Sequence, residues 1–214
     1  SQRAVREAYG ALSHVDVNLR LVPVHSSNEP VIDILMEIDE GTKASVGLVR
    51  INGNLLTKDK VIRRHVRLRP GHPFNAAEIQ RAKDRIERTR LFNPPVRITL
   101  LDEMPDAPGY RDVLVEVKEA DTGSLNFGVA VGTDSGVLGE ISLLQRNFDV
   151  ADVPESWLEF WRGRAFRGAG QDFSMILQPG DELFNYQIGL TEPYFLETDW
   201  SIGGSAGWKR RKYQ

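Results

Sequence analysis

The side chains of this 214-residue chain that could carry out a chemical reaction are few and scattered. Gly203–Gly207 has the spelling G-x-S-x-G of a serine nucleophile. A nucleophile elbow, however, needs a strand that turns sharply into a helix. Here the motif lies inside an alternating run between Trp200 and Trp208, which predicts an uninterrupted strand. We therefore expect no serine active site.

Metal and thiol chemistry have no better support. The chain has four histidines, and His65 and His72 have no partner ligands at the spacing of a metal site. It has no cysteine, which excludes disulfide frameworks, thiolate zinc sites and cysteine nucleophiles. The sequence therefore predicts a protein that is not an enzyme and that needs no metal or other cofactor.

The charges of the chain are nearly balanced. There are 30 acidic and 27 basic residues, a net charge of −3, so no overall attraction to nucleic acid is expected. Two short basic clusters stand out. We expect Arg63 and Arg64 to contact a partner protein, and Lys209–Lys212 to lie near lipid headgroups.

Transmembrane helices are not expected, because no stretch approaches the ~20 apolar residues that one requires. Membrane strands remain possible, since each needs only ~10 alternating residues. The sequence begins at Ser1 without an export signal, and we expect any such signal to lie outside it.

The composition of the chain changes near Ala120. Of its 19 glycines, 13 follow this residue, as do all four tryptophans. Glycine interleaved with aromatic residues is typical of a curved sheet or barrel wall. The change predicts two kinds of structure in one chain.

Residues 43–120 predict a mixed α and β unit. A strand over 44–51 is followed by a helix that begins near Thr57, and by a second helix that begins at Asn75 with Glu78 completing a capping box. Two alternating strands follow, over 96–101 and 113–117. The predicted order is strand, helix, helix, strand, strand.

Residues 1–42 resemble the end of an earlier copy of this unit. The triplet Gln2-Arg3-Ala4 recurs as Gln80-Arg81-Ala82, and each precedes two alternating strands. We therefore expect a helix and two strands, over 15–21 and 32–38.

Residues 121–214 predict about five longer strands that alternate apolar residues with Gln, Ser, Gly and Thr. Such strands fit a membrane barrel with a polar lumen, or alternatively a soluble antiparallel meander. The segment 149–171 interrupts them. It contains Asp152–Glu155, then Trp157, Leu158, Phe160 and Trp161, with Arg162, Arg164 and Arg167 behind. This pattern predicts a short amphipathic helix at the membrane surface.

Short motifs over nearly the whole chain resemble the BamA family of outer-membrane protein assembly factors. Individually they are weak, but their order and spacing are specific. They are Ile51–Asn54, Thr57 with Val61–Arg64, Pro70–Gly71 with Phe74–Asn75, Leu91–Phe92 with Val96, Asp112–Glu119, Thr122–Gly128, Gln145–Phe148 and Thr191–Phe195.

The resemblance implies an α+β POTRA repeat (β-α-α-β-β) over residues 43–120, followed by antiparallel transmembrane β-barrel strands. Residues 1–42 would then end the penultimate repeat, and residues 121–214 would form the first strands of an incomplete barrel, with the 149–171 insertion between two of them. The implied location is the bacterial outer membrane, with the POTRA repeats in the periplasm. The implied partners are nascent outer-membrane proteins, periplasmic lipoprotein subunits and outer-membrane lipid, and no nucleic acid.

Two strands are expected to carry the function through their backbones. An edge strand can accept an extended chain by β-augmentation, whatever that chain's side chains are. By resemblance, the client-binding edge is Val96, Arg97, Ile98, Thr99, Leu100 and Leu101. By the same resemblance, the lateral seam of the barrel is Leu125, Asn126, Phe127, Gly128 and Val129.

Two other interpretations stay open. One is a related two-partner secretion or translocation-type outer-membrane transporter. The other is a soluble β-rich enzyme or binding domain.

Overall fold

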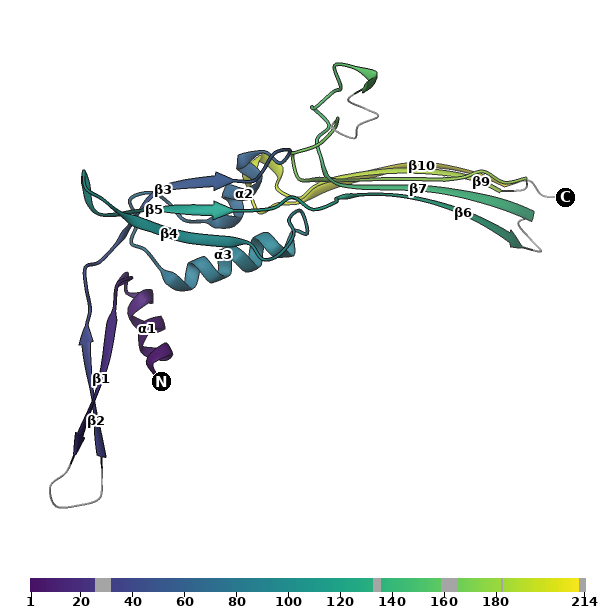
Figure 1. The fold of residues 1–214 in the computed structure, drawn as a ribbon. Coiled ribbons are helices and arrows are strands. Elements are labelled where there is room, and N and C mark those ends of the chain that lie inside the picture. The colour runs from purple at the N-terminus through teal and green to yellow at the C-terminus, as the bar shows by residue number, and fades with distance from the viewer. Residues whose placement is uncertain (26–31, 133–135, 159–164, 182, 212–214) are drawn as a thin grey trace. The chain divides into compact units, whose positions relative to one another are not determined.

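The computed structural model describes residues 1–25, 32–132, 136–158, 165–181 and 183–211, and it contains three α-helices, ten strands and one short 3₁₀ helix among them (Figure 1). The described chain divides into two units. Unit 1 comprises Ser1–Asn52, His65–Arg88 and Pro95–Val117, and unit 2 comprises Gly53–Arg64, Thr89–Pro94 and Lys118–Gln214.

Unit 1 contains a three-stranded sheet in which β5 (Ala107–Glu116) is central. β3 (Ser45–Asn52) pairs with it in parallel, and β4 (Arg97–Met104) pairs with it antiparallel. The helices α2 (Asp59–Val66) and α3 (Ala76–Arg88) lie between β3 and β4 in the sequence. The order strand, helix, helix, strand, strand is therefore as predicted.

The core of unit 1 follows the predicted helical and strand periodicities. Ala82 and Ile86 of α3 are fully buried, as are Val113 and Val115 of β5. Burial of such side chains is the main favourable contribution to the stability of the unit.

The start of α3 confirms one half of the predicted capping box. The Ala77 N–H donates to Asn75 Oδ1 at 2.9 Å, which satisfies a backbone donor of the first turn. The Glu78 carboxylate does not return to the cap. It accepts hydrogen bonds from Arg85 at 2.5 Å and Arg81 at 3.2 Å. The stronger cationic partners have taken the place of the cap N–H.

Strand β3 departs from simple alternation. Val46 and Val49 are both buried although they are three residues apart, because the strand is irregular between them. Asp112, which is 2% exposed, accepts a hydrogen bond from the Leu48 N–H at 2.7 Å and pairs with Arg50 at 2.9 Å. A bulge of this kind shifts the alternation of side chains between the two faces, so Val46 takes the inward position that a regular spacing of two residues back from Val49 would give to Gly47.

The first 42 residues contain the expected helix and two strands. α1 (Gln2–Ala11) precedes the antiparallel pair β1 (Asn18–His25) and β2 (Ile32–Asp39). Arg111 of β5 donates to the Asp16 carboxylate through its two terminal guanidinium nitrogens, at 3.1 and 2.6 Å. Bidentate pairing of this type fixes orientation as well as distance.

Unit 2 contains one curved five-stranded antiparallel sheet (Figure 1). Each strand pairs with its neighbour in the sequence, so the strand order β6-β7-β8-β9-β10 is a meander, and the five predicted strands are confirmed. Their bounds are β6 (Gly123–Gly132), β7 (Gly136–Phe148), β8 (Gln171–Gln178), β9 (Leu183–Glu192) and β10 (Ile202–Arg211).

Several residues of the predicted features lie outside the described ranges. They are Phe160, Trp161, Arg162 and Arg164 of the predicted amphipathic helix and Lys212 of the second basic cluster. In the described part of the insertion, Val150–Ser156 is not helical, and helical geometry is recorded at Trp157 and Leu158.

The buried carboxylate of Asp112 provides a stability test. We expect Asp112→Ala to destabilise unit 1 by about 1–3 kcal/mol, because the Leu48 N–H loses its acceptor. Asp112→Asn keeps an acceptor and is expected to cost less. The measurement is amide hydrogen exchange over residues 45–52, with exposed Asp102→Ala as the control. Equal exchange in Asp112→Ala and the control would contradict this role for Asp112.

Candidate functional site

Strand β4 lies at the edge of the unit 1 sheet, where its only strand neighbour among the described residues is β5. The strand begins at Arg97, one residue later than predicted. Val96 is buried, and its N–H donates to Glu87 Oε1 at 3.0 Å. Arg97 and Thr99 are exposed, Ile98 is buried, and the pairing with β5 becomes irregular after Leu100, so that Leu101 falls in the irregular part.

The opposite edge of the same sheet is different. On the outer side of β3, the Val46 N–H donates to His72 O at 2.9 Å, and the Gly71 N–H donates to Val46 O at 2.8 Å. The adjacent Ala44 carbonyl accepts a hydrogen bond from the Phe74 N–H at 2.9 Å. Part of the β3 edge is therefore covered by the segment 71–74, and β4 presents the more open of the two edges within the described chain.

Strand β6 lies at one edge of the unit 2 sheet and β10 at the other. All five predicted seam residues, Leu125, Asn126, Phe127, Gly128 and Val129, lie within β6 and are paired to β7 on one side. Phe127 and Val129 are more than 70% exposed. Strand β6 is therefore an edge strand with exposed side chains, and no other described strand pairs with its outer side.

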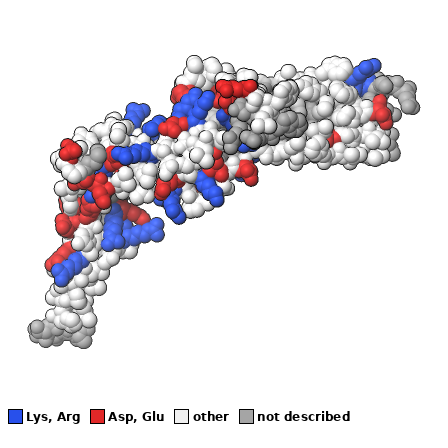
Figure 2. Space-filling model, turned by 45° about the horizontal axis from the view of Figure 1, so that its top comes forward, with Lys and Arg blue, Asp and Glu red and all other residues white. Residues whose placement is uncertain are grey.

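The two faces of the five-stranded sheet differ in polarity. One row of side chains across all five strands is Leu125, Leu143, Met175, Ile188 and Ala206. The next row on that face is Phe127, Ile141, Leu177, Tyr186 and Trp208. We call this surface the apolar face. The sheet is mostly free of charged side chains in the view of Figure 2, in contrast to the densely charged unit 1.

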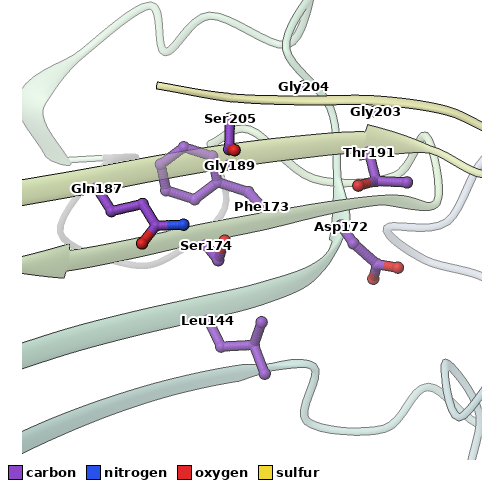
Figure 3. Close-up of a pocket in the computed structure, with 10 residues that line it drawn as sticks. All are labelled: Leu144, Asp172, Phe173, Ser174, Gln187, Gly189, Thr191, Gly203, Gly204 and Ser205. Atoms are coloured by element: carbon purple, nitrogen blue, oxygen red, sulfur yellow. The ribbon is translucent and has the colours of Figure 1, made fainter. Parts of the chain in front are cut away.

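The opposite face of the sheet is polar and hollowed. Figure 3 shows residues that line an open hollow on this face, among them Asp172, Ser174, Gln187, Thr191 and Ser205. The hollow has a volume of about 370 Å³. Gly189 and Gly203 also line it, and a Cβ on either would lie 2.8 Å from a hydroxyl oxygen of a neighbouring strand. One apolar and one polar face is the pattern of a lipid-facing side and a lumen.

The two arginines predicted to contact a partner differ in environment. Arg63 is half exposed and forms a weak pair with Asp59 at 3.5 Å. The Arg64 side chain is only 10% exposed, and its guanidinium carbon lies 4.2 Å from the centre of the Tyr194 ring and one nitrogen 3.9 Å from Glu192. Arg63 thus stays a predicted partner contact, whereas the Arg64 side chain is engaged within unit 2.

Two opposing effects act on the pKa of Arg64. Burial lowers the pKa of its guanidinium, and the negative charges of Glu192 and Glu197 oppose that shift. Arginine remains protonated in any case. A cation held over an aromatic ring in a partly desolvated place contributes about 0.5–2 kcal/mol, so this contact helps to hold the β9–β10 turn against α2.

A second polar contact lies at the same end of the unit 2 sheet. Asn147 is buried, donates to Thr57 Oγ1 at 2.8 Å, and accepts from the Gly170 N–H at 3.0 Å. Nearby, Lys58 pairs with the buried Asp149, and Glu119 accepts the N–H groups of Leu56 and Thr57 at 2.8 and 2.6 Å. Together these residues tie the segment before α2 to the ends of β7 and β8.

Sequence reasoning did not assign these tying residues any role, although several belong to the quoted motifs. The available signal was an asparagine within an otherwise alternating strand. Asn147 has φ of 59°, a left-handed conformation that asparagine tolerates better than most residues.

The residues considered for catalysis and metal binding occupy structural positions. Gly203–Gly207 lies inside strand β10, without the strand-to-helix turn of a nucleophile elbow. No group of three or more His, Asp or Glu side chains suited to a metal ion occurs in the described ranges. No helix described here is long and apolar enough to cross a membrane.

Comparison with known proteins finds a matching family and several similar proteins. Residues 44–120 match the POTRA family, described as "Surface antigen variable number repeat". The fold of residues 44–120 is POTRA-like. The outer membrane protein assembly factor BamA of Neisseria meningitidis is 23% identical over 201 residues, which are 93% of this chain and 22% of that protein. BamA of Nitratidesulfovibrio vulgaris is 29% identical over 172 residues, 79% of this chain and 21% of that protein.

The crystal structure of Haemophilus ducreyi BamA lacking POTRA domains 1–3 has the same fold. It superposes with a TM-score of 0.76 at 24% identity, over 97% of this chain and 35% of that one. The resemblance to the BamA family predicted from the sequence is therefore confirmed. The chain spans about a fifth of the length of the curated relatives it matches.

Asn147 provides a test of the contacts between the segment before α2 and the ends of β7 and β8. We expect Asn147→Ala to destabilise this region by about 1–3 kcal/mol, because Thr57 and Gly170 lose a buried partner. The left-handed backbone adds ~1 kcal/mol for alanine. Asn147→Gly removes the same contacts without that strain, so it should be the milder variant.

The measurement is amide hydrogen exchange over residues 167–171. Asn126→Ala is the control, because the Asn126 side chain makes only an exposed 3.4 Å hydrogen bond. Exchange in Asn147→Ala that matches the control would show that these contacts do not hold the region.

Proposed function

We propose that this chain is part of an assembly factor that inserts β-barrel proteins into the bacterial outer membrane. The observation that supports this most directly is a POTRA-like unit followed in the chain by an antiparallel sheet with one apolar and one polar face; in the POTRA-like unit, β4 has no second strand neighbour among the described residues. The names of the relatives point the same way, since those proteins are outer membrane protein assembly factors. The POTRA domain would lie in the periplasm and the five-stranded sheet in the membrane.

The first step in this proposal is capture of an unfolded client by β-augmentation on β4. An added strand would pair with the outward backbone groups of Arg97–Leu101, and Val96 would not take part because its N–H is bonded to Glu87. Such pairing is independent of client side chains, which suits a factor with many clients. The exposed side chains of Arg97 and Thr99 would contact the client's own side chains.

The second step is strand addition at the lateral seam formed by β6. A strand in water exchanges one hydrogen bond for another, at a net gain of only about 1 kcal/mol for each bond. Moving an unpaired strand into lipid costs several kcal/mol for each polar backbone group. A preformed edge at β6 therefore helps chiefly by sparing the client this penalty, and no nucleotide would be required.

Partner subunits would bind the exposed surface of the POTRA domain. Arg63, which is half exposed in the middle of α2, remains a candidate contact for periplasmic lipoprotein subunits. Arg64 would act from within, by holding the β9–β10 turn.

A related two-partner secretion or translocation-type transporter is the second candidate. It would share the POTRA domain and the barrel strands, but it would pass its substrate through the pore and not through the seam. The hollow on the polar face of the sheet, which would face the lumen, is compatible with either function.

Proline scanning of β4 tests client capture. Consecutive N–H groups of a strand point to opposite sides, so one of Thr99→Pro and Leu100→Pro removes an outward donor and the other removes a bond to β5. The variant that leaves hydrogen exchange of β5 unchanged is the informative one. We expect it to reduce crosslinking of an unfolded client strand about fivefold, equivalent to ~1 kcal/mol.

The matched controls are Thr99→Ala and Leu100→Ala, which keep both N–H groups. Full crosslinking by the informative proline variant would remove β4 as the capture edge. Ile98 is unsuitable for this test, because its side chain is 7% exposed and belongs to the core.

Arginine substitutions on β6 test which face of the sheet meets lipid. In the intact protein, Phe127→Arg is expected to destabilise the membrane-inserted state by about 2–4 kcal/mol. Asn126→Arg places the same charge one residue away on the polar face and should be tolerated. The measurement is the urea midpoint of folding in lipid vesicles, with Phe127→Ala correcting for the lost ring. Equal midpoints for the two arginine variants would favour the soluble alternative.

A further inference from the structure

The connection between β7 and β8 carries a group of exposed apolar side chains. Val150, Val153, Trp157 and Leu158 are 54, 68, 81 and 59% exposed. We call these four residues the exposed loop cluster. Large apolar side chains concentrated in nine residues are unusual on a surface that faces only water.

The base of this connection is well ordered by hydrogen bonds, so the exposure is built into the fold. The Phe166 N–H donates to Asp152 O at 2.9 Å, and the Asp149 N–H donates to Phe166 O at 2.9 Å. The Arg167 N–H donates to the Asp152 carboxylate at 3.1 Å, and the Val150 N–H to Gln171 Oε1 at 3.0 Å. Residues 149–152 and 166–171 thus form a fixed base from which the cluster extends.

An aromatic stack joins this base to the apolar face of the sheet. Phe173 lies in β8 two residues before Met175 and so shares its face. The Phe148 ring stacks on Phe173 at 4.7 Å between centroids, and the Phe166 ring stacks on Phe148 at 5.6 Å. The connection therefore leaves the sheet on its apolar side, and in Figure 1 it stands away from the plane of the strands.

A second apolar turn lies at the same end of the sheet. In an antiparallel meander, the β7–β8 and β9–β10 connections leave the same end. In the β9–β10 connection, Leu196 and Trp200 are each 78% exposed. Two neighbouring turns at one level therefore both present apolar or aromatic side chains, and Trp at a membrane boundary has its ring in the headgroup region.

We propose that the exposed loop cluster inserts into the headgroup region of the periplasmic leaflet and anchors this end of the barrel wall to the lipid surface. The proposal rests on the proposed function, since it takes the apolar face to be lipid-facing. Lipid is the occupant because the base from which the cluster extends is joined to that face by the Phe166–Phe148–Phe173 stack. Apolar side chains at this boundary bind by burial of their surface and need no specific headgroup.

Spin labels in the intact protein test the proposal. The 214 residues contain no cysteine, so Val153→Cys and Trp157→Cys, in a background without cysteines elsewhere, each accept one nitroxide. Phe127→Cys reports the apolar face, and Asp106→Cys, exposed in the β4–β5 turn, reports water. The protein is reconstituted in phosphatidylethanolamine and phosphatidylglycerol vesicles, and the ratio of oxygen to nickel-complex collisions is measured at each position.

We expect the collision ratio at residues 153 and 157 to exceed that at residue 106 severalfold and to stay below that at residue 127, because the headgroup region is shallower than the middle of the sheet. Values at 153 and 157 equal to the residue 106 value, with a high value at 127, would overturn this proposal and leave the barrel interpretation intact. Labels at 153 and 157 shielded from both reagents would overturn it in favour of a protein surface. A low value at 127 would instead reject the membrane placement of the sheet, and with it the proposed function.

Discussion

Every backbone N–H and C=O group needs a hydrogen-bond partner, and this requirement governs the structure more than any single side chain does. Within the described residues, side chains complete the bonding at four places where regular structure is interrupted or begins: Asn75 at the start of α3, Glu87 before β4, Asp112 at the β3 bulge and Glu119 before α2. Among these residues, the outer sides of β4 and β6 have no strand neighbour, and neither do those of β1, β2 and β10. In water such edges are tolerable, whereas in lipid they are costly.

The same requirement connects the two proposed steps of assembly. The β4 edge suits water, where an incoming strand merely exchanges partners and binding is weak and reversible. The β6 edge would act where water is absent, and there each new backbone bond counts for much more. A client would thus pass from loose to firm pairing without any change in the kind of bond. The polar contacts of Arg64, Asn147 and Glu119 lie at the end of the sheet nearest the α2 segment, so they would operate outside the hydrocarbon.

The sequence predicted the elements better than their contacts. Alternation located β4 to β10, and start signals at Thr57 and Asn75 located α2 and α3, because these patterns depend on nearby residues alone. It missed the reversal of inward positions in β3, since that depends on Asp112, more than sixty residues away. It treated Arg63 and Arg64 as alike, although only packing against Tyr194 separates them. Glu78 was expected at the cap but binds two arginines, a choice that local sequence does not decide.

The meander order of β6 to β10 also bears on how this segment itself comes to be folded. Because every strand pairs with its sequence neighbour, the sheet can grow one hairpin at a time. The longest closure, between β7 and β8, spans residues 149–170, and the entropic cost of closing a loop grows only slowly with its length. The bond between Asn147 and Thr57, by contrast, joins residues 90 positions apart, so it is suited to form after the hairpins. Growth by successive addition at a free border is the reaction proposed for the clients, and the segment's own topology allows it to be made in the same way.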